Sequence, residues 1–449
     1  MQQFYITVYV LNKNYSLFLE QCIESLLNQS NMNFELIVVD NVSDDNSISL
    51  LSSKYKSLNV IYLKQSLRLT EVGNMIARIS QGTHFVRLDA DDWVEYDFID
   101  TLYIKLYENS LYAAIFPNYH EVNIDGKIIK TVKRFDFDSE VSLFDLPAHG
   151  ACTLISKKVF EEIGGYDETL DRQDGYDLWL KLIKNYKVSN IKKPLFYYRQ
   201  HNLNLTRSQK KLLEVRTDIL YKHALQNGLD LNSVVFVVSI QRHDDFFGYL
   251  SSLKYGNKTV LNNLLDKIYT INKNAIVCIS SESDREDFVI DSDSVFFHRR
   301  TTNNQSLKYA LLDAVTYIKQ LTDYELKYVV SLTIDYPFVD SHYILAAISY
   351  INYFDTYSVD SVCIEDSILF KHNGHTLEPV YNSTVTRFER DTLYKRSGGI
   401  NVIRIDKLEE YDGVSTKKTG HIIIDKLSSI RADNVEIVEL LHNKGELIT

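Results

Sequence analysis

The stretch THFVRLDADDW, residues 83–93, places three carboxylates within four positions, directly after a run of apolar residues. The apolar run predicts a buried strand, and the acidic residues predict a turn at its carboxyl end. In a parallel α/β sheet, ligands bind beyond the carboxyl ends of the strands. Two interpretations are therefore open: an acidic turn that water solvates, or a site at which Asp89 and Asp91 together bind a cation. An isolated Asp-x-Asp favours the first interpretation, so the context must decide.

The residues on either side of this stretch alternate between strand and helix patterns. Strands are predicted at residues 4–11, 34–41, 58–63 and 83–89. Helices are predicted at residues 15–29, 48–55 and 71–80. This alternation predicts a parallel sheet that is covered by helices on both faces.

The same alternation starts again in the second half of the chain. Strands are predicted at residues 233–240, 274–280 and 328–335, and helices at residues 260–271 and 306–321. Before them, residues 205–228 are charged, have helical periodicity and end in a glycine, as helices often do. We therefore predict two Rossmann-like α/β domains, residues 1–204 and 231–449, joined by a connecting helix at residues 205–230.

The composition is that of a soluble globular protein, with 45% hydrophobic and 24% charged residues among 449. The net charge of −11 opposes binding to nucleic acid. We expect a cytoplasmic location, because the sequence has no secretory signal and no run of apolar residues that would form a transmembrane segment. The cysteines lack metal-binding spacing and are expected to be small buried hydrophobes: Cys22, Cys152, Cys278 and Cys363.

A second aspartate supports the cation interpretation. Asp40 ends the predicted strand ELIVVD, so two strand ends that we expect to be neighbours would present carboxylates to one crevice. Mg²⁺ or Mn²⁺ prefers oxygen ligands and usually takes one or two carboxylates, with phosphates and water supplying the rest. A metal held in this way would neutralise a diphosphate leaving group.

Six segments, in order, resemble the family 2 glycosyltransferases, which have the GT-A fold. They are ITVYVLNKNYSLFLEQCIESLLNQS, FELIVVDNVSDDNS, GNMIARISQGTHFVRLDADDW, GACTLISKKVFEEIGGYDETL, DGYDLWLKL and PLFYYRQH, within residues 3–201. The resemblance implies a metal-dependent transfer of a sugar from a nucleoside diphosphate donor, a UDP-sugar in most of the family, with inversion at the anomeric carbon. The expected cofactor is Mn²⁺ or Mg²⁺.

The resemblance also implies a role for individual residues. Asp40 would bind the nucleotide base, and Asp89 with Asp91 would bind the metal and the diphosphate. Asp174 would be the catalytic base, and His201 would bind the metal near the diphosphate. The sequence departs from the family at Gly175 and Asn41, where acidic residues are usual.

Several of these residues also have an ordinary structural interpretation. Asp174 precedes GYDLWLKLI and suits the N-cap of a helix. His201 suits a buried histidine whose ring is satisfied by the backbone. Asp92 is expected to order the turn rather than to bind metal, and Arg87 fits a surface ion pair as well as a phosphate contact.

The second half resembles the cytidylyltransferases that activate acidic sugars, over residues 233–445. The similar segments are SVVFVVSIQR, NNQSLKYALLDAV, YVVSLTIDYPFVDSHYILAAI, RFERDTLYKRSGGINVIR and SSIRADNVEIVELL. By this resemblance Asp335 and Asp433 would bind the metal, Arg242 the nucleotide CTP, and Arg387 and Arg390 the carboxylate of the sugar.

The second half also departs from that family. Arg431 and Ser397 replace an aspartate and an asparagine, and the loop QRHDDFFGYLSSLKYGNK has two aspartates where the family has a phosphate-binding loop. Two interpretations remain: an active cytidylyltransferase that forms a CMP-activated acidic sugar, or a domain that kept the fold and serves for docking.

The whole sequence thus predicts a glycosyltransferase with a cytidylyltransferase-like domain that is degenerate or makes the chain bifunctional. We expect it to act in bacterial surface polysaccharide synthesis, on a glycan or lipid-linked acceptor. The expected place is the cytoplasm or the inner face of the membrane, as a peripheral protein. The connecting helix and the resemblance of the second half also favour a homodimer.

Overall fold

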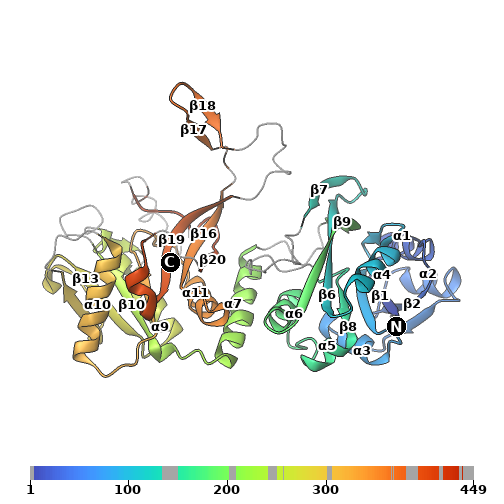
Figure 1. The fold of residues 1–449 in the computed structure, drawn as a ribbon, viewed down its shortest axis with the longest axis horizontal. Coiled ribbons are helices and arrows are strands. Elements are labelled where there is room, and N and C mark those ends of the chain that lie inside the picture. The colour runs from blue at the N-terminus through green and yellow to red at the C-terminus, as the bar shows by residue number, and fades with distance from the viewer. Residues whose placement is uncertain are drawn as a thin grey trace. The chain divides into compact units, whose positions relative to one another are not determined.

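The computed structural model describes residues 5–133, 150–201, 209–240, 250–255, 257–300, 306–365, 367, 369–380, 393–413, 418–433 and 437. The chain divides into two compact units, one of residues 1–208 with 369–391 and one of residues 209–368 with 392–449. Both units have mixed sheets with helices packed on them, which confirms the α/β class (Figure 1).

The first unit is built on a nine-stranded sheet in the order β3-β2-β1-β4-β8-β6-β9-β5, with β7 paired to β6. Its strands are β1 (Ile6–Asn12), β2 (Phe34–Asp40), β3 (Asn59–Tyr62), β4 (His84–Asp89), β5 (Trp93–Val94), β6 (Tyr112–Val122), β7 (Ile128–Val132), β8 (Leu154–Ser156) and β9 (Lys187–Arg199). Strands β1 to β4 are parallel to one another. Strand β8 runs antiparallel to both β4 and β6, so the sheet is mixed rather than wholly parallel.

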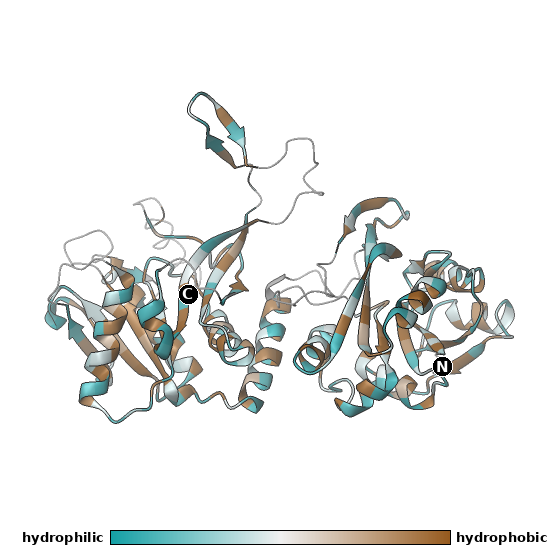
Figure 2. Cartoon of the chain, in the orientation of Figure 1, coloured by the Kyte–Doolittle hydropathy of each residue, from teal (hydrophilic) through white to brown (hydrophobic). Residues whose placement is uncertain are grey.

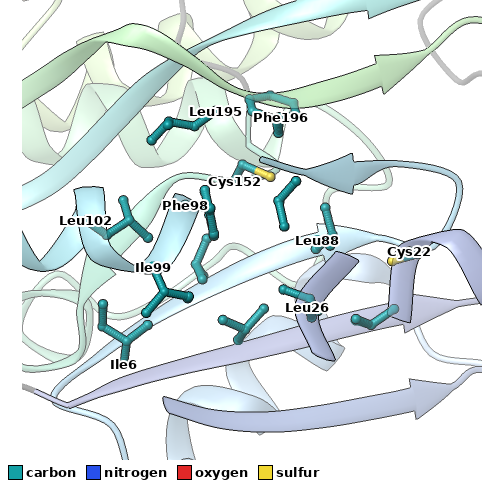
Figure 3. Packing of buried hydrophobic residues seen from close by; sticks show 14 of the residues in the cluster. Ile6, Cys22, Leu26, Leu88, Phe98, Ile99, Leu102, Cys152, Leu195 and Phe196 are labelled. Carbon is teal, nitrogen blue, oxygen red and sulfur yellow. The ribbon is translucent and has the colours of Figure 1, made fainter. Parts of the chain in front are cut away.

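The helices of this unit are α1 (Ser16–Leu27), α2 (Ser47–Ser53), α3 (Leu69–Ile79), α4 (Phe98–Glu108), α5 (Lys157–Glu162) and α6 (Asp174–Ile183). Helix α1 has buried residues at helical spacing, among them Leu19, Ile23 and Leu26. These pack with α4 and alternate residues of β1 into one core, part of which is drawn in Figure 3. The other face of β1 meets α3, because a side chain at Gly73 would contact the Tyr9 hydroxyl at 3.3 Å.

The second unit has a seven-stranded sheet in the order β14-β13-β10-β15-β19-β16-β20. Its strands are β10 (Val234–Ser239), β13 (Ile276–Ser281), β14 (Val295–Arg299), β15 (Tyr328–Leu332), β16 (Ser358–Glu365), β19 (Leu393–Arg404) and β20 (Thr419–Ile423). The first four of the spatial order are parallel, and β19 is antiparallel to both of its neighbours. Figure 2 shows that the central strands of each unit are its most hydrophobic part.

The helices of the second unit are α7 (Gln209–Gln226), α9 (Val260–Ile271), α10 (Leu307–Leu321) and α11 (Ser341–Phe354). Helix α7 lies within the region predicted to connect the domains, and it packs against α11. Two short ribbons complete the described strands: β11 (Lys254–Tyr255) with β12 (Lys258–Thr259), and β17 (Phe370–His372) with β18 (Leu377–Pro379). The described residues also form 3₁₀ turns: η1 (Leu231–Ser233), η2 (Arg285–Asp287) and η3 (Ile405–Glu410). All four cysteines are buried thiols.

Candidate active site

Three strand ends of the first unit carry the polar residues on which the sequence analysis focused. Asn12 ends β1, Asp40 ends β2 and Asp89 ends β4. Asn12 pairs with Asp40 across β1 and β2, and Leu11 pairs with Asp89 across β1 and β4. The two aspartates therefore lie on either side of the end of β1. We expected their strands to be direct neighbours, and that expectation was wrong.

Asp40 lies in a buried hydrogen-bond network. Its side chain accepts a hydrogen bond from Asn12 Nδ2 at 2.8 Å and another from the backbone N–H of Ser43 at 3.0 Å. The residue is only 1% exposed. The network fixes the loop after β2, and the role of Asp40 toward a nucleotide base stays a prediction.

Asp91 lies in the turn that follows β4 and contacts a histidine from a distant part of the chain. Its Oδ2 lies 2.8 Å from Nε2 of His201, and the two side chains are 10% and 5% exposed. The His201 ring also stacks on Phe18 of α1, with ring centroids 5.9 Å apart. The structure therefore brings together two residues that the sequence analysis assigned to one metal site. The ring of His201 thus contacts an acidic side chain, whereas the structural interpretation expected contacts with the backbone.

Arg199, which the sequence analysis did not single out, holds this turn in place. Its Nε donates to the carbonyl oxygen of Asp91 at 2.9 Å, and its backbone N–H donates to Oδ1 of Asp92 at 2.9 Å. The guanidinium lies between the rings of Phe18 and Trp93, 4.5 Å and 4.7 Å from their centroids. Asp92 thus orders the turn, as expected. The signal that we missed was the position of Arg199, two residues before the candidate metal ligand His201.

Asp174 is the first residue of α6, and it contacts the metal motif through Arg87. Gln173, with a left-handed φ of 63°, is the N-cap, so the N-cap interpretation of Asp174 was wrong. Oδ2 of Asp174 accepts a hydrogen bond from Nη1 of Arg87 at 2.9 Å, while Arg87 Nε lies 3.0 Å from Oδ1 of Asp89. The side chain of Arg87 is 7% exposed, so the surface ion pair that we considered for it was also wrong.

Burial shifts the ionisation of the carboxylate at the end of β4. It raises the pKa of Asp89 to about 6, against the opposing effect of the neighbouring Arg87 guanidinium. The negative charges of Asp91 and Asp174 raise this pKa further. A nearby cation would favour the ionised form of Asp89, and protons would compete with that cation.

The donor atoms fit a hard divalent cation that is shared with a ligand. Asp89 is engaged through Oδ1 and Asp91 through Oδ2, so each keeps one carboxylate oxygen without a partner among the described residues. No group of three or more His, Cys, Asp or Glu side chains in the described part of the chain would enclose a metal alone. This arrangement suits Mg²⁺ or Mn²⁺, which commonly take one or two carboxylates and complete their shell with phosphate and water.

The residues of the second unit for which a metal role was predicted are Asp335 and Asp433. Nε of Arg431 lies 2.6 Å from Oδ2 of Asp335. Asp433 is exposed. Arg431 stands where the resembled family has an aspartate, so this unit has one carboxylate fewer to offer a metal. The metal roles of Asp335 and Asp433 stay predictions. Arg242, Arg387 and Arg390 lie outside the described residues.

The comparisons with known proteins concern the first unit. Residues 7–164 match the sequence profile of the family described as glycosyl transferase family 2. The first unit therefore contains a family 2 glycosyltransferase domain, as the sequence resemblance predicted. No helix in the described ranges has the length and hydrophobicity needed to span a membrane.

Three of the curated relatives are distant and much longer than the matched region. Hyaluronan synthase of Pasteurella multocida is 22% identical over 46% of this chain and 21% of its own length. Chondroitin synthase of Escherichia coli is 22% identical over 46% of this chain and 30% of its own length. Glycosyltransferase GlyA of Streptococcus pneumoniae is 26% identical over 45% of this chain and 31% of its own length. This chain therefore spans less than a third of the length of each of these relatives.

A solved structure gives a weaker likeness. S. aureus TarS 1–349, determined in complex with UDP-GlcNAc, is 17% identical and covers 49% of this chain and 66% of that chain. The TM-score is 0.43, which is below the level at which two folds are taken to be the same.

Proposed function

We propose that the first unit is an inverting glycosyltransferase that moves a sugar from a UDP-sugar to a hydroxyl group of a glycan or lipid-linked acceptor. The observation that carries this proposal is the group of side chains at one end of the sheet. Asp91 lies against His201, and Asp89 is linked through Arg87 to Asp174. The family 2 match supports the reaction class.

Each of these residues has a part in the proposed chemistry. Asp89, Asp91 and His201 would hold Mn²⁺ or Mg²⁺, which neutralises the diphosphate leaving group when it is bound. Asp174 takes the proton of the acceptor hydroxyl as that oxygen bonds to the anomeric carbon. The bond from this carbon to the diphosphate oxygen breaks, UDP leaves, and attack from the opposite face inverts the carbon.

Asp174 has the geometry that a general base needs. Its Oδ2 is held by Arg87, and its Oδ1 has no hydrogen-bond partner among the described residues. The side chain is 9% exposed, so only a small part of it is open to an acceptor hydroxyl. A carboxylate fixed through one oxygen presents the other in a defined orientation, and this favours proton transfer.

The names of the relatives support a polysaccharide product. Hyaluronan synthase and chondroitin synthase are named for long glycans, and a further relative from E. coli is described as an O-antigen biosynthesis glycosyltransferase. We therefore propose a role in bacterial surface polysaccharide synthesis at the cytoplasmic side of the membrane. The test is UDP release from a panel of UDP-sugars with Mn²⁺, with and without oligosaccharide acceptors. Failure of every donor would contradict the proposal.

The pKa of Asp89 predicts how donor binding depends on pH. Because that pKa is raised to about 6, the carboxyl takes up a proton as the pH falls through this value and loses the charge that attracts the metal. We expect the affinity for UDP with Mn²⁺, measured by calorimetry, to fall about tenfold between pH 7 and pH 5. The control is the same titration on Asp89→Asn, which lacks this carboxyl. An equal fall in affinity in that variant would contradict the role of Asp89.

For the second unit we propose a domain of cytidylyltransferase-like descent that serves for docking and lacks metal-dependent catalysis. The support is that Arg431 replaces an aspartate of the resembled family and forms an ion pair with Asp335 at 2.6 Å.

This proposal predicts that Asp335→Asn leaves UDP-sugar turnover within twofold of the unaltered chain. It also predicts that the full chain, given CTP, Mg²⁺ and a panel of acidic sugars, releases no pyrophosphate. Pyrophosphate release that is lost in Asp335→Asn would instead establish the bifunctional alternative, in which this unit forms a CMP-activated sugar.

A further inference from the structure

Arg87 joins two carboxylates to which we assign different tasks. Its Nε lies 3.0 Å from Oδ1 of Asp89, and its Nη1 lies 2.9 Å from Oδ2 of Asp174. Residues 87 and 174 are far apart in the sequence, at the third-last position of β4 and the first position of α6. One guanidinium therefore sets the distance between the metal motif and the proposed base.

The surroundings of Arg87 leave it little freedom. Tyr9, its register partner on β1, is fully buried, and Tyr166 is 4% exposed. Burial raises the pKa of both phenols, with the charge of Asp174 adding to the effect, so they stay neutral beside the ion pairs. A Cβ built on Gly150 would lie 2.9 Å from Oδ2 of Asp174 and 3.2 Å from Nη2 of Arg87. Gly150 therefore encloses one side of the ion pair between Arg87 and Asp174, and it leaves no room there for a side chain.

We propose that Arg87 is a positioning residue of the transfer reaction, and this inference rests on the proposed function of the first unit. Arg87 holds the Asp174 carboxylate in register with Asp89, so that the acceptor oxygen and the metal-bound diphosphate meet at the anomeric carbon. An arginine suits this task because its planar fork fixes two carboxylates at once, whereas the ammonium of lysine is a single point charge.

The alternative is that Arg87 only balances two buried negative charges. Arg87→Lys distinguishes the two roles, because lysine keeps the charge and loses the fork. If Arg87 positions the base, kcat for UDP release from the preferred UDP-sugar falls about tenfold to a hundredfold, since small displacements of catalytic groups have effects of this size. The KM for the UDP-sugar changes less than threefold. If Arg87 only balances charge, kcat stays within twofold, and the proposal is overturned.

A second variant tests the same geometry without replacing a charged residue. Gly150→Ala would press on the Asp174 carboxylate at 2.9 Å, and we expect the same fall in kcat with an unchanged KM. This variant also decides the question if Arg87→Lys does not fold. Unchanged kcat in Gly150→Ala would then overturn the proposal.

Lys181→Gln is the matched control for stability. Lys181 lies on the same helix as Asp174, and its Nζ is 2.7 Å from Oδ2 of the buried Asp177. The variant loses an ion pair of α6 without touching the site, so it is expected to lower the unfolding temperature and to keep kcat. A loss of kcat in this control equal to that in Arg87→Lys would assign the effect to the helix as a whole and overturn the proposal. An inactive unaltered chain, in contrast, would overturn the proposed function itself.

Discussion

Asp91→Asn is expected to lower the turnover of the UDP-sugar by about a hundredfold to a thousandfold, because loss of one group that stabilises charge in the transition state has effects of this size. The substitution removes the negative charge that lies 2.8 Å from His201 and that we assign to the metal. The amide has nearly the same shape, so the turn held by Arg199 through the Asp91 carbonyl oxygen is retained. We also expect weaker binding of UDP with Mn²⁺, measured by calorimetry, and an unchanged unfolding temperature.

The matched control is Asp44→Asn, which makes the same change of charge at an exposed position of the same unit. This control should keep both turnover and UDP binding. If Asp91→Asn kept its turnover within threefold of the control, the assignment of Asp91 to the metal and diphosphate would be wrong.

Asp174→Asn is expected to reduce turnover by about a hundredfold to ten-thousandfold, the range typical for loss of a general base. Asparagine can still accept the hydrogen bond that Nη1 of Arg87 donates at 2.9 Å, but it cannot take the proton of the acceptor. Because we assign Asp174 to the acceptor and not to the donor, the affinity for UDP with Mn²⁺ should stay within about threefold. This separation of turnover from donor binding distinguishes a base from a metal ligand.

Asp171→Asn is the control for this second prediction. Asp171 belongs to the same segment before α6, its side chain is 73% exposed, and it forms a surface ion pair with Arg68 at 2.8 Å. Such a pair contributes little to stability, so turnover should be unchanged. Normal turnover in Asp174→Asn, measured beside this control, would show that another group takes the proton.

The parts of the fold that the sequence predicted are those whose signal is local. Strands β1, β2 and β4 are mostly apolar and end in a polar residue, and each end falls where the acidic or amide side chain begins the turn. For this reason Asp40 and Asp89 could be placed at one edge of the sheet from the sequence alone. The order of the strands could not be predicted from such a local signal. Strand β1 lies between β2 and β4, which we expected to be neighbours.

Short strands and pairings between distant residues were not predictable. Strands β5 and β8 have two and three residues, too few for a periodic pattern, so the antiparallel pairs that these two strands form gave no signal. Arg87 lies inside an apolar run, and its partner Asp174 is 87 positions away. A local sequence pattern therefore could not predict this pair. Arg431 was recognised as a departure from a family pattern, but its contact with Asp335 across 96 positions required the fold.

The most direct test of the central claim is a crystal of the full chain soaked with UDP, CTP and Mn²⁺, with the manganese located by its anomalous scattering. The account predicts one manganese peak in the first unit, bonded to carboxylate oxygen of Asp89 or Asp91 and to the diphosphate of UDP, and none at Asp335. A UDP molecule bound without metal contact to either aspartate, or a manganese peak at Asp335 with CTP, would contradict it.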